Sequence, residues 1–310
     1  MTRLLKVAAA QTGPIHWEES RKTVVGRLLA LMAEAKSMNC HLVVFPELAL
    51  TTFFPRYYME DPKKMDPWFE DQMPNPAVQP LFSYSQKHGI GFSIGYAEKT
   101  LAGEHFNTSI LVDRTGTIVG KYRKVHLPGH SKYEPERQWQ HLEKRYFKPG
   151  DLGFPVWRTM DSIIGMCICN DRRWPETFRV MGLQGVELVV LGYNTPKLNS
   201  LKKDESAETR MHQNHLCMQS GAYQNACWVV GTAKAGNEDG FEMMAGSSII
   251  NPNGEIVAIA QTSEDELLTF NCDLDDCTFP KRTTFNFDAH RRIEHYGLIC
   301  SQTGVEPPAQ

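Results

Sequence analysis

Short apolar runs rich in β-branched residues alternate along the chain with longer stretches of helical spacing. In the first half, the runs predict strands over residues 4–10, 42–45, 90–96, 109–112 and 118–122. Apolar positions at helical spacing predict a helix within 17–38, and a proline in the first turn supports a second helix over 76–88. This alternation is typical of an α/β fold, in which helices connect the strands.

The second half repeats the pattern. Strands are predicted over residues 156–160, 163–168, 188–191, 228–232, 247–250, 256–260 and 267–272. Helices are predicted near 175–184 and 205–225, and the turn sequences at 113–116 and 251–254 occupy comparable places in the two halves. Two similar halves imply two sheets packed face to face with helices outside. Because no Gly/Ser linker separates them, we expect one domain over residues 1–310.

Three segments do not fit this regular pattern. Residues 51–75 and 123–153 are long loops of mixed character, and long ordered loops usually carry function. The C-terminal segment 280–310 begins with several apolar and aromatic residues. We therefore expect it to pack on the body or on another subunit.

Composition narrows the class of function. The 310 residues carry a formal net charge of -3 and no broad basic stretch, which disfavours nucleic acid and favours a small-molecule substrate. No run approaches the roughly 20 apolar residues of a membrane span, and the short apolar N-terminus enters a Gly-Pro turn instead of a cleavage site. The eight cysteines lack the spacing of a disulfide scaffold. We expect a soluble cytoplasmic protein with reduced thiols.

The first chemical candidate is Glu47, which follows the predicted strand 42–45 and Pro46. Ligands collect at the carboxyl ends of parallel strands, so a carboxylate there is a candidate general base. The alternative is a Glu that begins a helix or forms a salt bridge.

The second candidate is Lys124, in a cationic run that ends the predicted strand 118–122. Such a cluster is usually a solvated face. If the chain stays extended, however, Lys124 and His126 share one side, and an inward lysine could stabilise an oxyanion.

The third candidate is Cys169, which an apolar strand delivers to its end before Pro175 opens a helix. Backbone amides and the positive end of the helix dipole would favour a thiolate there. Cys167 lies within the apolar run and suits a buried structural cysteine better.

Five blocks of sequence, at residues 45–56, 126–130, 141–147, 169–176 and 192–196, resemble the nitrilase superfamily of carbon–nitrogen hydrolases. The resemblance extends over nearly the whole chain and is greatest to N-carbamoyl-D-amino acid amidohydrolases. It implies a four-layer α-β-β-α sandwich, no cofactor or metal, and a homodimer or homotetramer.

The resemblance also implies roles for residues. Glu47 would take the thiol proton, Cys169 would attack a ureido carbonyl, and Lys124 with the amide of Asn170 would hold the oxyanion. Glu143 corresponds to a second glutamate that orients Lys124 and the water; its alternative is a surface Glu beside two cations. The side chains of His126 and His141 would support the pocket.

Substrate choice is inferred from Arg172 and Arg173, because guanidinium groups just after the nucleophile suit an α-carboxylate. One of them could instead pair with Asp171 or Glu176, and the sequence leaves open which. Asn194 and Thr195 are carried over as polar partners of the same substrate. The predicted reaction converts N-carbamoyl-D-amino acids to D-amino acid, ammonia and carbon dioxide, with the D configuration following from the resemblance alone.

One departure concerns residues 198–212 and the positions after them. Gln213 and Asn214, flanked by His212 and His215, replace a histidine pair of the family, which leaves the range of substrate side chains open. Within the superfamily, a β-ureidopropionase-like enzyme or an aliphatic amidase is the alternative. A metal hydrolase lacks ligands at suitable spacing, and a non-catalytic scaffold would not need all three triad positions filled.

Overall fold

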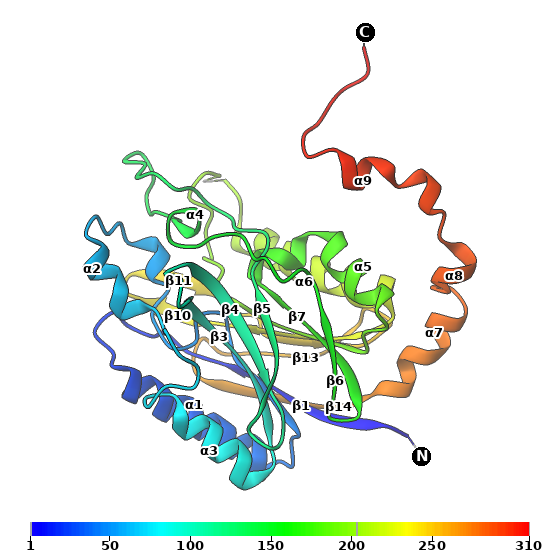
Figure 1. The fold of residues 1–310 in the computed structure, drawn as a ribbon, viewed down its shortest axis with the longest axis horizontal. Coiled ribbons are helices and arrows are strands. Elements are labelled where there is room, and N and C mark those ends of the chain that lie inside the picture. The colour runs from blue at the N-terminus through cyan, green and yellow to red at the C-terminus, as the bar shows by residue number, and fades with distance from the viewer. Residues whose placement is uncertain (1, 203, 310) are drawn as a thin grey trace.

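The computed structural model describes residues 2–202 and 204–309 and consists of two six-stranded sheets packed face to face, with helices on the outside (Figure 1). The first sheet has the order β14-β1-β2-β3-β4-β5. Its strands are β1 (Leu4–Gln11), β2 (Leu42–Val44), β3 (Gly91–Lys99), β4 (His105–Val112), β5 (Ile118–Arg123) and β14 (Glu266–Asp273).

The second sheet has the order β13-β12-β9-β8-β7-β6. Its strands are β6 (Val156–Thr159), β7 (Ser162–Ile168), β8 (Leu188–Tyr193), β9 (Trp228–Ala233), β12 (Ser248–Ile250) and β13 (Ile256–Ile259). In each sheet three parallel strands, β1–β3 or β7–β9, are flanked by antiparallel neighbours on both sides. This shared order confirms the prediction of two similar halves in an α-β-β-α sandwich.

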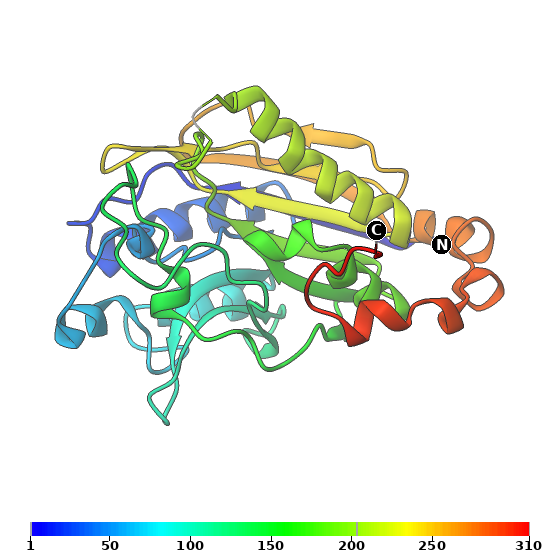
Figure 2. The same ribbon diagram turned by 90° about the horizontal axis from the view of Figure 1, so that it is seen from above.

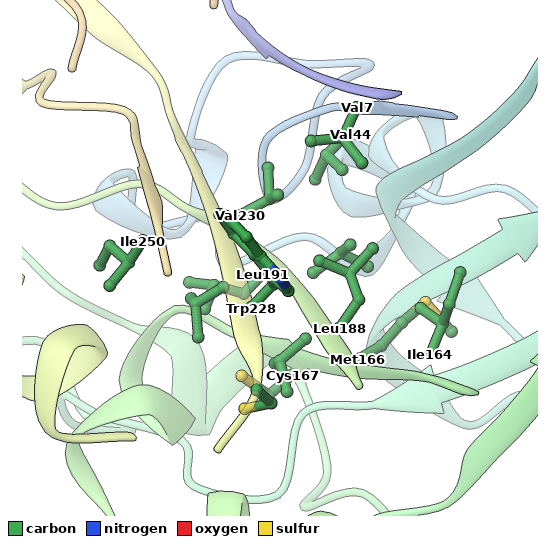
Figure 3. Packing of buried hydrophobic residues seen from close by; sticks show 14 of the residues in the cluster. Val7, Val44, Ile164, Met166, Cys167, Leu188, Leu191, Trp228, Val230 and Ile250 are labelled. Carbon is green, nitrogen blue, oxygen red and sulfur yellow. The ribbon is translucent and has the colours of Figure 1, made fainter. Parts of the chain in front are cut away.

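The main core lies where the inner faces of the sheets meet (Figure 3). Val7 and Val44 contribute from the first sheet, and Met166, Leu188 and Val230 from the second, all 1% exposed or less. Because strands buried on both faces need apolar side chains at successive positions, they appear in the sequence as continuous apolar runs.

Two helices cover each sheet. Helices α1 (Arg21–Ser37) and α3 (Gln79–His88) pack on the first, and α5 (Pro175–Leu183) and α6 (Ala207–Asn225) on the second. Helix α1 begins later than residue 17 because the side chain of Ser20 accepts the N–H of Thr23 and caps the helix there. None of the helices in the described part of the chain is both long and apolar enough to cross a membrane.

Several shorter elements escape the sequence pattern. They are the hairpin β10 (Ala235–Glu238) and β11 (Phe241–Met244), and the helices α2 (Pro62–Met65), α4 (Glu143–Tyr146), α7 (Thr278–Arg282), α8 (Phe287–His290) and α9 (Gly297–Ser301). The C-terminal helices follow the outside of the second half, as Figures 1 and 2 show. Phe285 contacts Tyr223 and Phe287 lies against Arg179, whereas Phe279 and Leu298 are more than 70% exposed.

Candidate active site

Four strands of the two sheets end around one region and deliver polar side chains to it. Glu47 comes three residues after β2, Lys124 directly after β5, Cys169 directly after β7, and Asn194 directly after β8. All four residues are at most 4% exposed. The carboxyl ends of the strands thus bring together residues that lie far apart in the chain, as the sequence predicted.

Lys124 connects two buried carboxylates. Its Nζ lies 2.7 Å from Glu47 Oε1 and 2.6 Å from Glu143 Oε2, and all three side chains are fully buried. Burial alone would lower the pKa of Lys124, but the charge that Cys169 carries when ionised and the carboxylates of Glu143 and Glu47 raise it above its ordinary value. The lysine therefore remains an ammonium, and Glu143 lies against it instead of on the surface.

The carboxylate of Glu47 is held from several sides. Oε2 accepts the backbone N–H of Asn194 at 2.9 Å, and Oε1 accepts Asn107 Nδ2 at 2.7 Å as well as Lys124. The amide of Asn194 also donates to the backbone oxygen of Glu47 at 2.9 Å. The next residue, Leu48, has a φ of 45°, so the chain turns sharply just after the carboxylate.

Cys169 begins the short 3₁₀ helix η3 (Cys169–Arg173) with a φ of 49°. A non-glycine residue in this left-handed region is strained by roughly 1 kcal/mol and is common at functional sites. The buried carboxylate of Asp171 stabilises the turn, since it accepts the N–H groups of Ile168 and His126 and the hydroxyl of Tyr122.

The surroundings of Cys169 favour the protonated form of its thiol. Burial is the main effect that raises the pKa of this thiol, and the charge of Glu47 raises it further. The charges of Lys124 and Arg172 act in the opposite direction. The sequence predicted that the start of a helix would favour the thiolate; burial outweighs that effect. A base beside the sulfur is therefore needed, and Glu47 is the carboxylate whose charge acts most strongly on the thiol.

Cys167 occupies a different environment two residues earlier. It is 1% exposed within the apolar core, where Figure 3 shows it among core side chains. Burial raises its pKa well above the ordinary value. Its surroundings match the structural cysteine that the sequence indicated.

The structure separates the two neighbouring arginines. Arg172 is buried, donates to the backbone oxygen of Cys169 at 2.5 Å and to Thr195 Oγ1 at 3.0 Å, and lies over the ring of Tyr193. These contacts fix the turn that carries the nucleophile. Neither Asp171 nor Glu176 pairs with it among the described ion pairs.

Arg173, in contrast, is exposed at the hollow. Its Nη1 lies 3.3 Å from Asn170 Oδ1, and no carboxylate of residues 2–202 or 204–309 forms an ion pair with it. The charge of Arg172, together with the partial loss of solvent around the guanidinium beside the hollow, lowers the pKa of Arg173 to about 10. The guanidinium groups of Arg172 and Arg173 repel each other, and an anionic ligand bound to Arg173 would offset this repulsion.

A cavity of about 140 Å³, called here the catalytic hollow, opens above the sulfur. Its lining includes Trp139, His141, Cys169, Arg173, Asn194 and Thr195. Arg210 also lines it, although its guanidinium pairs with Glu205 at 2.8 Å. A thiol, a carboxylate and an ammonium beside a hollow of this kind are suited to nucleophilic acyl transfer.

The two histidines that the sequence placed beside the substrate differ in location. His141 lines the catalytic hollow and its Nε2 lies 3.0 Å from Glu143 Oε1. His126 lies outside the hollow, stacked on Trp174 with its Nδ1 2.8 Å from Asp171 Oδ1. Because β5 ends at Arg123, the chain is no longer extended at His126 and the assumed shared side does not hold.

The structure also places Asn214 and His215, which lie just before Met218 where the sequence departs from the family pattern. Asn214 Nδ2 lies 3.2 Å from the hydroxyl of Tyr193, and His215 Nε2 lies 3.0 Å from the backbone oxygen of Gly246. Both side chains are buried supports of the second sheet. In the described ranges no group of three or more His, Cys, Asp or Glu side chains is placed to hold a metal ion.

Comparisons with known proteins define the class. A family model described as carbon-nitrogen hydrolase matches residues 6–282. An N-carbamoylputrescine amidase of Solanum lycopersicum is 30% identical, with 98% of both chains covered. A citrullinase of Francisella tularensis is 28% identical, with 85% of this chain and 87% of that protein covered.

Solved structures agree on the fold. A carbon–nitrogen hydrolase of Helicobacter pylori has a TM-score of 0.81 at 24% identity, covering 97% of this chain and 99% of its own. An amidase of Nesterenkonia sp. has a TM-score of 0.68 at 19% identity, covering 92% and 96%. The fold is that of the nitrilase superfamily. The chain belongs to the carbon–nitrogen hydrolase family, and it is a hydrolase of carbon–nitrogen bonds in amide or carbamoyl substrates.

Proposed function

We propose that this enzyme hydrolyses N-carbamoyl-D-amino acids to the D-amino acid, ammonia and carbon dioxide. The observation that carries the proposal is the guanidinium of Arg173, which lines the same hollow as Cys169 and has no carboxylate partner among the described residues. A substrate carboxylate a few bonds from the scissile carbonyl would pair with it. Charge-assisted hydrogen bonds of this kind contribute about 1.5–3 kcal/mol.

In the proposed mechanism, Glu47 takes the thiol proton while the sulfur of Cys169 attacks the ureido carbon. Lys124 and the backbone N–H of Asn170 stabilise the oxyanion. The bond to the amino-acid nitrogen then breaks, the nitrogen takes the proton from Glu47, and a carbamoyl thioester remains. Water then loses a proton to Glu47 and adds to the thioester carbon. The C–S bond breaks, the departing sulfur takes the proton back from Glu47, and the released carbamic acid decomposes to ammonia and carbon dioxide.

Other carbamoyl substrates fit the charge of the hollow less well. N-carbamoylputrescine, named for the plant relatives, would present an ammonium to Arg173 and to the nearby Arg210. Like charges at close range disfavour binding. Citrulline carries its carboxylate farther from the ureido group, and an aliphatic amide would leave Arg173 without a partner.

A β-ureidopropionase-like activity is the second candidate, because N-carbamoyl-β-alanine also offers a carboxylate to Arg173. The preference for the D configuration rests on the resemblance of the sequence blocks. A panel of N-carbamoyl-D- and L-amino acids, N-carbamoyl-β-alanine, N-carbamoylputrescine, citrulline, an aliphatic amide and a nitrile, assayed by ammonia release, separates these possibilities.

The variant Arg173→Leu tests the carboxylate contact. We expect kcat/KM for the N-carbamoyl-D-amino acid to fall roughly 10- to 100-fold, mainly through KM, because a charge-assisted contact is lost. Turnover of an aliphatic amide should change less than about 3-fold. Arg158→Leu, an exposed arginine on β6, is the control of equal charge change. Faster turnover of N-carbamoylputrescine than of every N-carbamoyl amino acid would refute the proposal.

A further inference from the structure

Asn107 contacts both Glu47 and Lys124, although nothing in its sequence context indicates this. It lies on β4, is 0% exposed, and its Nδ2 donates to Glu47 Oε1 at 2.7 Å. Its backbone oxygen accepts the N–H of Lys124 at 2.8 Å. One residue of β4, a strand paired on both sides by β3 and β5, therefore fixes the relative positions of Glu47 and Lys124.

The hydrogen bonds to Glu47 distinguish its two oxygens. Oε1 accepts both Asn107 Nδ2 and Lys124 Nζ, whereas Oε2 accepts the backbone N–H of Asn194 and no other donor in the described part of the chain. A carboxylate oxygen offers about two acceptor positions. Oε1 is thus saturated, and Oε2 retains one position for a further proton.

The orientation of the Asn107 amide is set by Glu47 alone. Its Oδ1 is buried without a hydrogen-bond partner among the described residues, so the amide does not belong to a wider structural network. The opposite orientation would direct that oxygen at a carboxylate. A buried polar atom left without a partner is unfavourable, which is the pattern found where position at a site outweighs local stability.

We propose that Asn107 is a positioning residue of the general base: it holds the carboxylate of Glu47 through Oε1 and so directs the proton of the Cys169 thiol to Oε2. The proposal rests on the role of Glu47 as base but on no particular substrate. The hydrogen bond that Asn107 donates to Glu47 favours the charged carboxylate over the neutral acid. It also holds the carboxylate plane so that Oε2 remains the acceptor.

The test compares the pH dependence of kcat/KM for the wild-type enzyme, Asn107→Leu and Asn107→Asp, with whichever amide or carbamoyl substrate is turned over. Leucine removes the donor at similar volume, so the acidic limb should move up by about one pH unit and kcat at neutral pH should fall roughly 10- to 100-fold. Because no substrate group contacts Asn107 in this account, KM should change less than about 3-fold. Aspartate places a second carboxylate beside Glu47 and should move the acidic limb further up.

The matched control is Thr108→Val, the next residue of β4. Its hydroxyl is equally buried and donates to Glu98 Oε2 at 2.7 Å, away from Glu47. This variant should lose stability without any shift of the acidic limb. If Asn107→Leu does not fold, Asn107→Asp, which keeps the shape of the side chain, provides the same readout.

Two outcomes are kept apart by this design. A folded Asn107→Leu or Asn107→Asp enzyme with the acidic limb of the wild type overturns the positioning role and leaves only a structural one. Turnover of an aliphatic amide without turnover of any N-carbamoyl acid overturns the proposed substrate, and the test of Asn107 then proceeds with the amide.

Discussion

The catalytic residues balance their charges within a space closed to water. Lys124 lies between Glu47 and Glu143, and all three side chains are shielded from water. Transfer of the thiol proton from Cys169 to Glu47 moves a negative charge but leaves the total charge of the cluster unchanged. Because burying additional charge is costly, such an internal transfer suits a buried site.

Replacing the nucleophile separates the two neighbouring cysteines. Cys169→Ala should abolish turnover and leave the melting temperature within a few degrees of the wild type. Cys167→Ala creates a small cavity in the core and should cost about 1 kcal/mol of stability while most activity remains. Ammonia release and thermal unfolding measure both effects. Loss of activity in Cys167→Ala alone would move the nucleophile to that residue.

At the scale of elements, strand β8 packs so closely on the chain around Glu47 that only glycine fits at position 192. A Cβ built on Gly192 would lie 2.2 Å from the backbone nitrogen of Glu47. The two sheets thus meet at the backbone just where the base leaves its strand. This contact explains how elements from the two halves hold one catalytic group.

Gly192→Ala should therefore displace Glu47 and lower kcat at least 100-fold, because a displacement of about 1 Å at the reacting groups can cost that much. Steady-state kinetics and circular dichroism provide the measurement. Gly26→Ala is the control, since a Cβ on that helical glycine of α1 meets no atom within 4 Å. A fully active Gly192→Ala enzyme would show that Glu47 needs no such contact.

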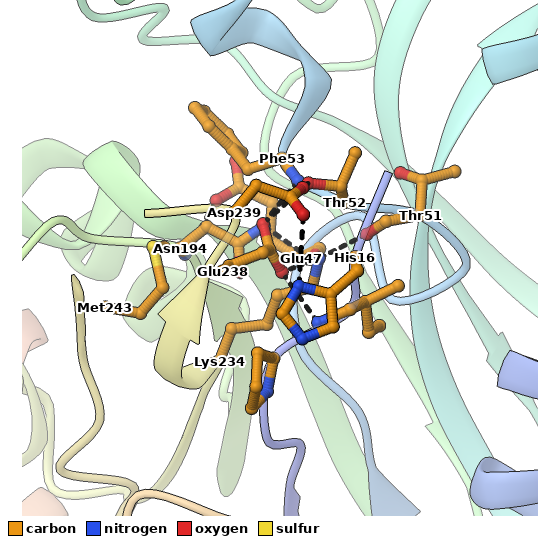
Figure 4. Close-up of polar contacts among 12 residues, drawn as sticks. His16, Glu47, Thr51, Thr52, Phe53, Asn194, Lys234, Glu238, Asp239 and Met243 are labelled. Atoms are coloured by element: carbon orange, nitrogen blue, oxygen red, sulfur yellow. Dashed lines mark hydrogen bonds and ion pairs between the residues drawn. The ribbon is translucent and has the colours of Figure 1, made fainter. Parts of the chain in front are cut away.

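The hairpin β10–β11 is anchored beneath the loop after Glu47 by buried charges, as Figure 4 shows. Glu238 accepts Arg56 Nη2 at 2.8 Å, Lys234 Nζ at 3.2 Å and the backbone N–H of Phe53 at 2.6 Å. The hairpin also contacts the wall of the hollow, since the N–H of Met244 donates to the backbone oxygen of Thr195. The hairpin therefore connects the loop after Glu47 with the hollow.

This network predicts a specific pH dependence of stability. Burial opposes ionisation of Glu238, but the charges of Lys234 and Arg56 hold its pKa below the ordinary value. The contribution of the ionised Glu238 to folding stability is therefore complete above the pKa of about 4.3 in the unfolded chain. It is lost as the pH falls through the lower pKa in the folded protein. The variant Glu238→Gln should have a free energy of unfolding about 3–5 kcal/mol lower than the wild type at pH 7. This free energy, measured by urea unfolding, should fall less on acidification in the variant than in the wild type.

The control for this change is Glu242→Gln on the same hairpin, where an exposed pair with Lys197 should contribute less than about 1 kcal/mol. An equal decrease in the free energy of unfolding of the two variants would show that the buried network stabilises the protein no more than the exposed pair does.

The sequence predicted all the strands of the two six-stranded sheets, because their apolar runs are long and bounded by turns. The hairpin β10–β11 was missed because the buried charges of Lys234 and Glu238 interrupt the apolar pattern. Glu47, Lys124 and Cys169 could be found from their places at strand ends. The role of Asn107 could not, since a polar residue inside a strand gives no indication of which distant side chain it meets.

At the scale of the whole molecule, the C-terminal segment leaves apolar side chains uncovered. Phe279, Ile293, Leu298 and Ile299 are 59–74% exposed. We propose, with the resemblance to the family, that a second copy of this chain covers them in a homodimer or larger homo-oligomer. Large exposed apolar patches are uncommon on monomers.

Light scattering coupled to size exclusion should accordingly report a dimer or tetramer. Leu298→Asp should weaken the assembly because it buries a charge at the contact, whereas Leu101→Asp, at an exposed turn far from the segment in the chain, should not. A wild-type protein that remains monomeric at micromolar concentration would contradict the proposal.

The central claim is that Cys169 carries the carbamoyl group during turnover, with Glu47 and Lys124 beside it. Rapid acid quenching of the enzyme during hydrolysis of an N-carbamoyl-D-amino acid, followed by peptide mass spectrometry, tests it most directly. We expect one carbamoyl group on the thiol of Cys169 in the wild-type enzyme and none in Cys169→Ala, which should also be inactive. A carbamoyl group on Cys167, or turnover by Cys169→Ala, would contradict it.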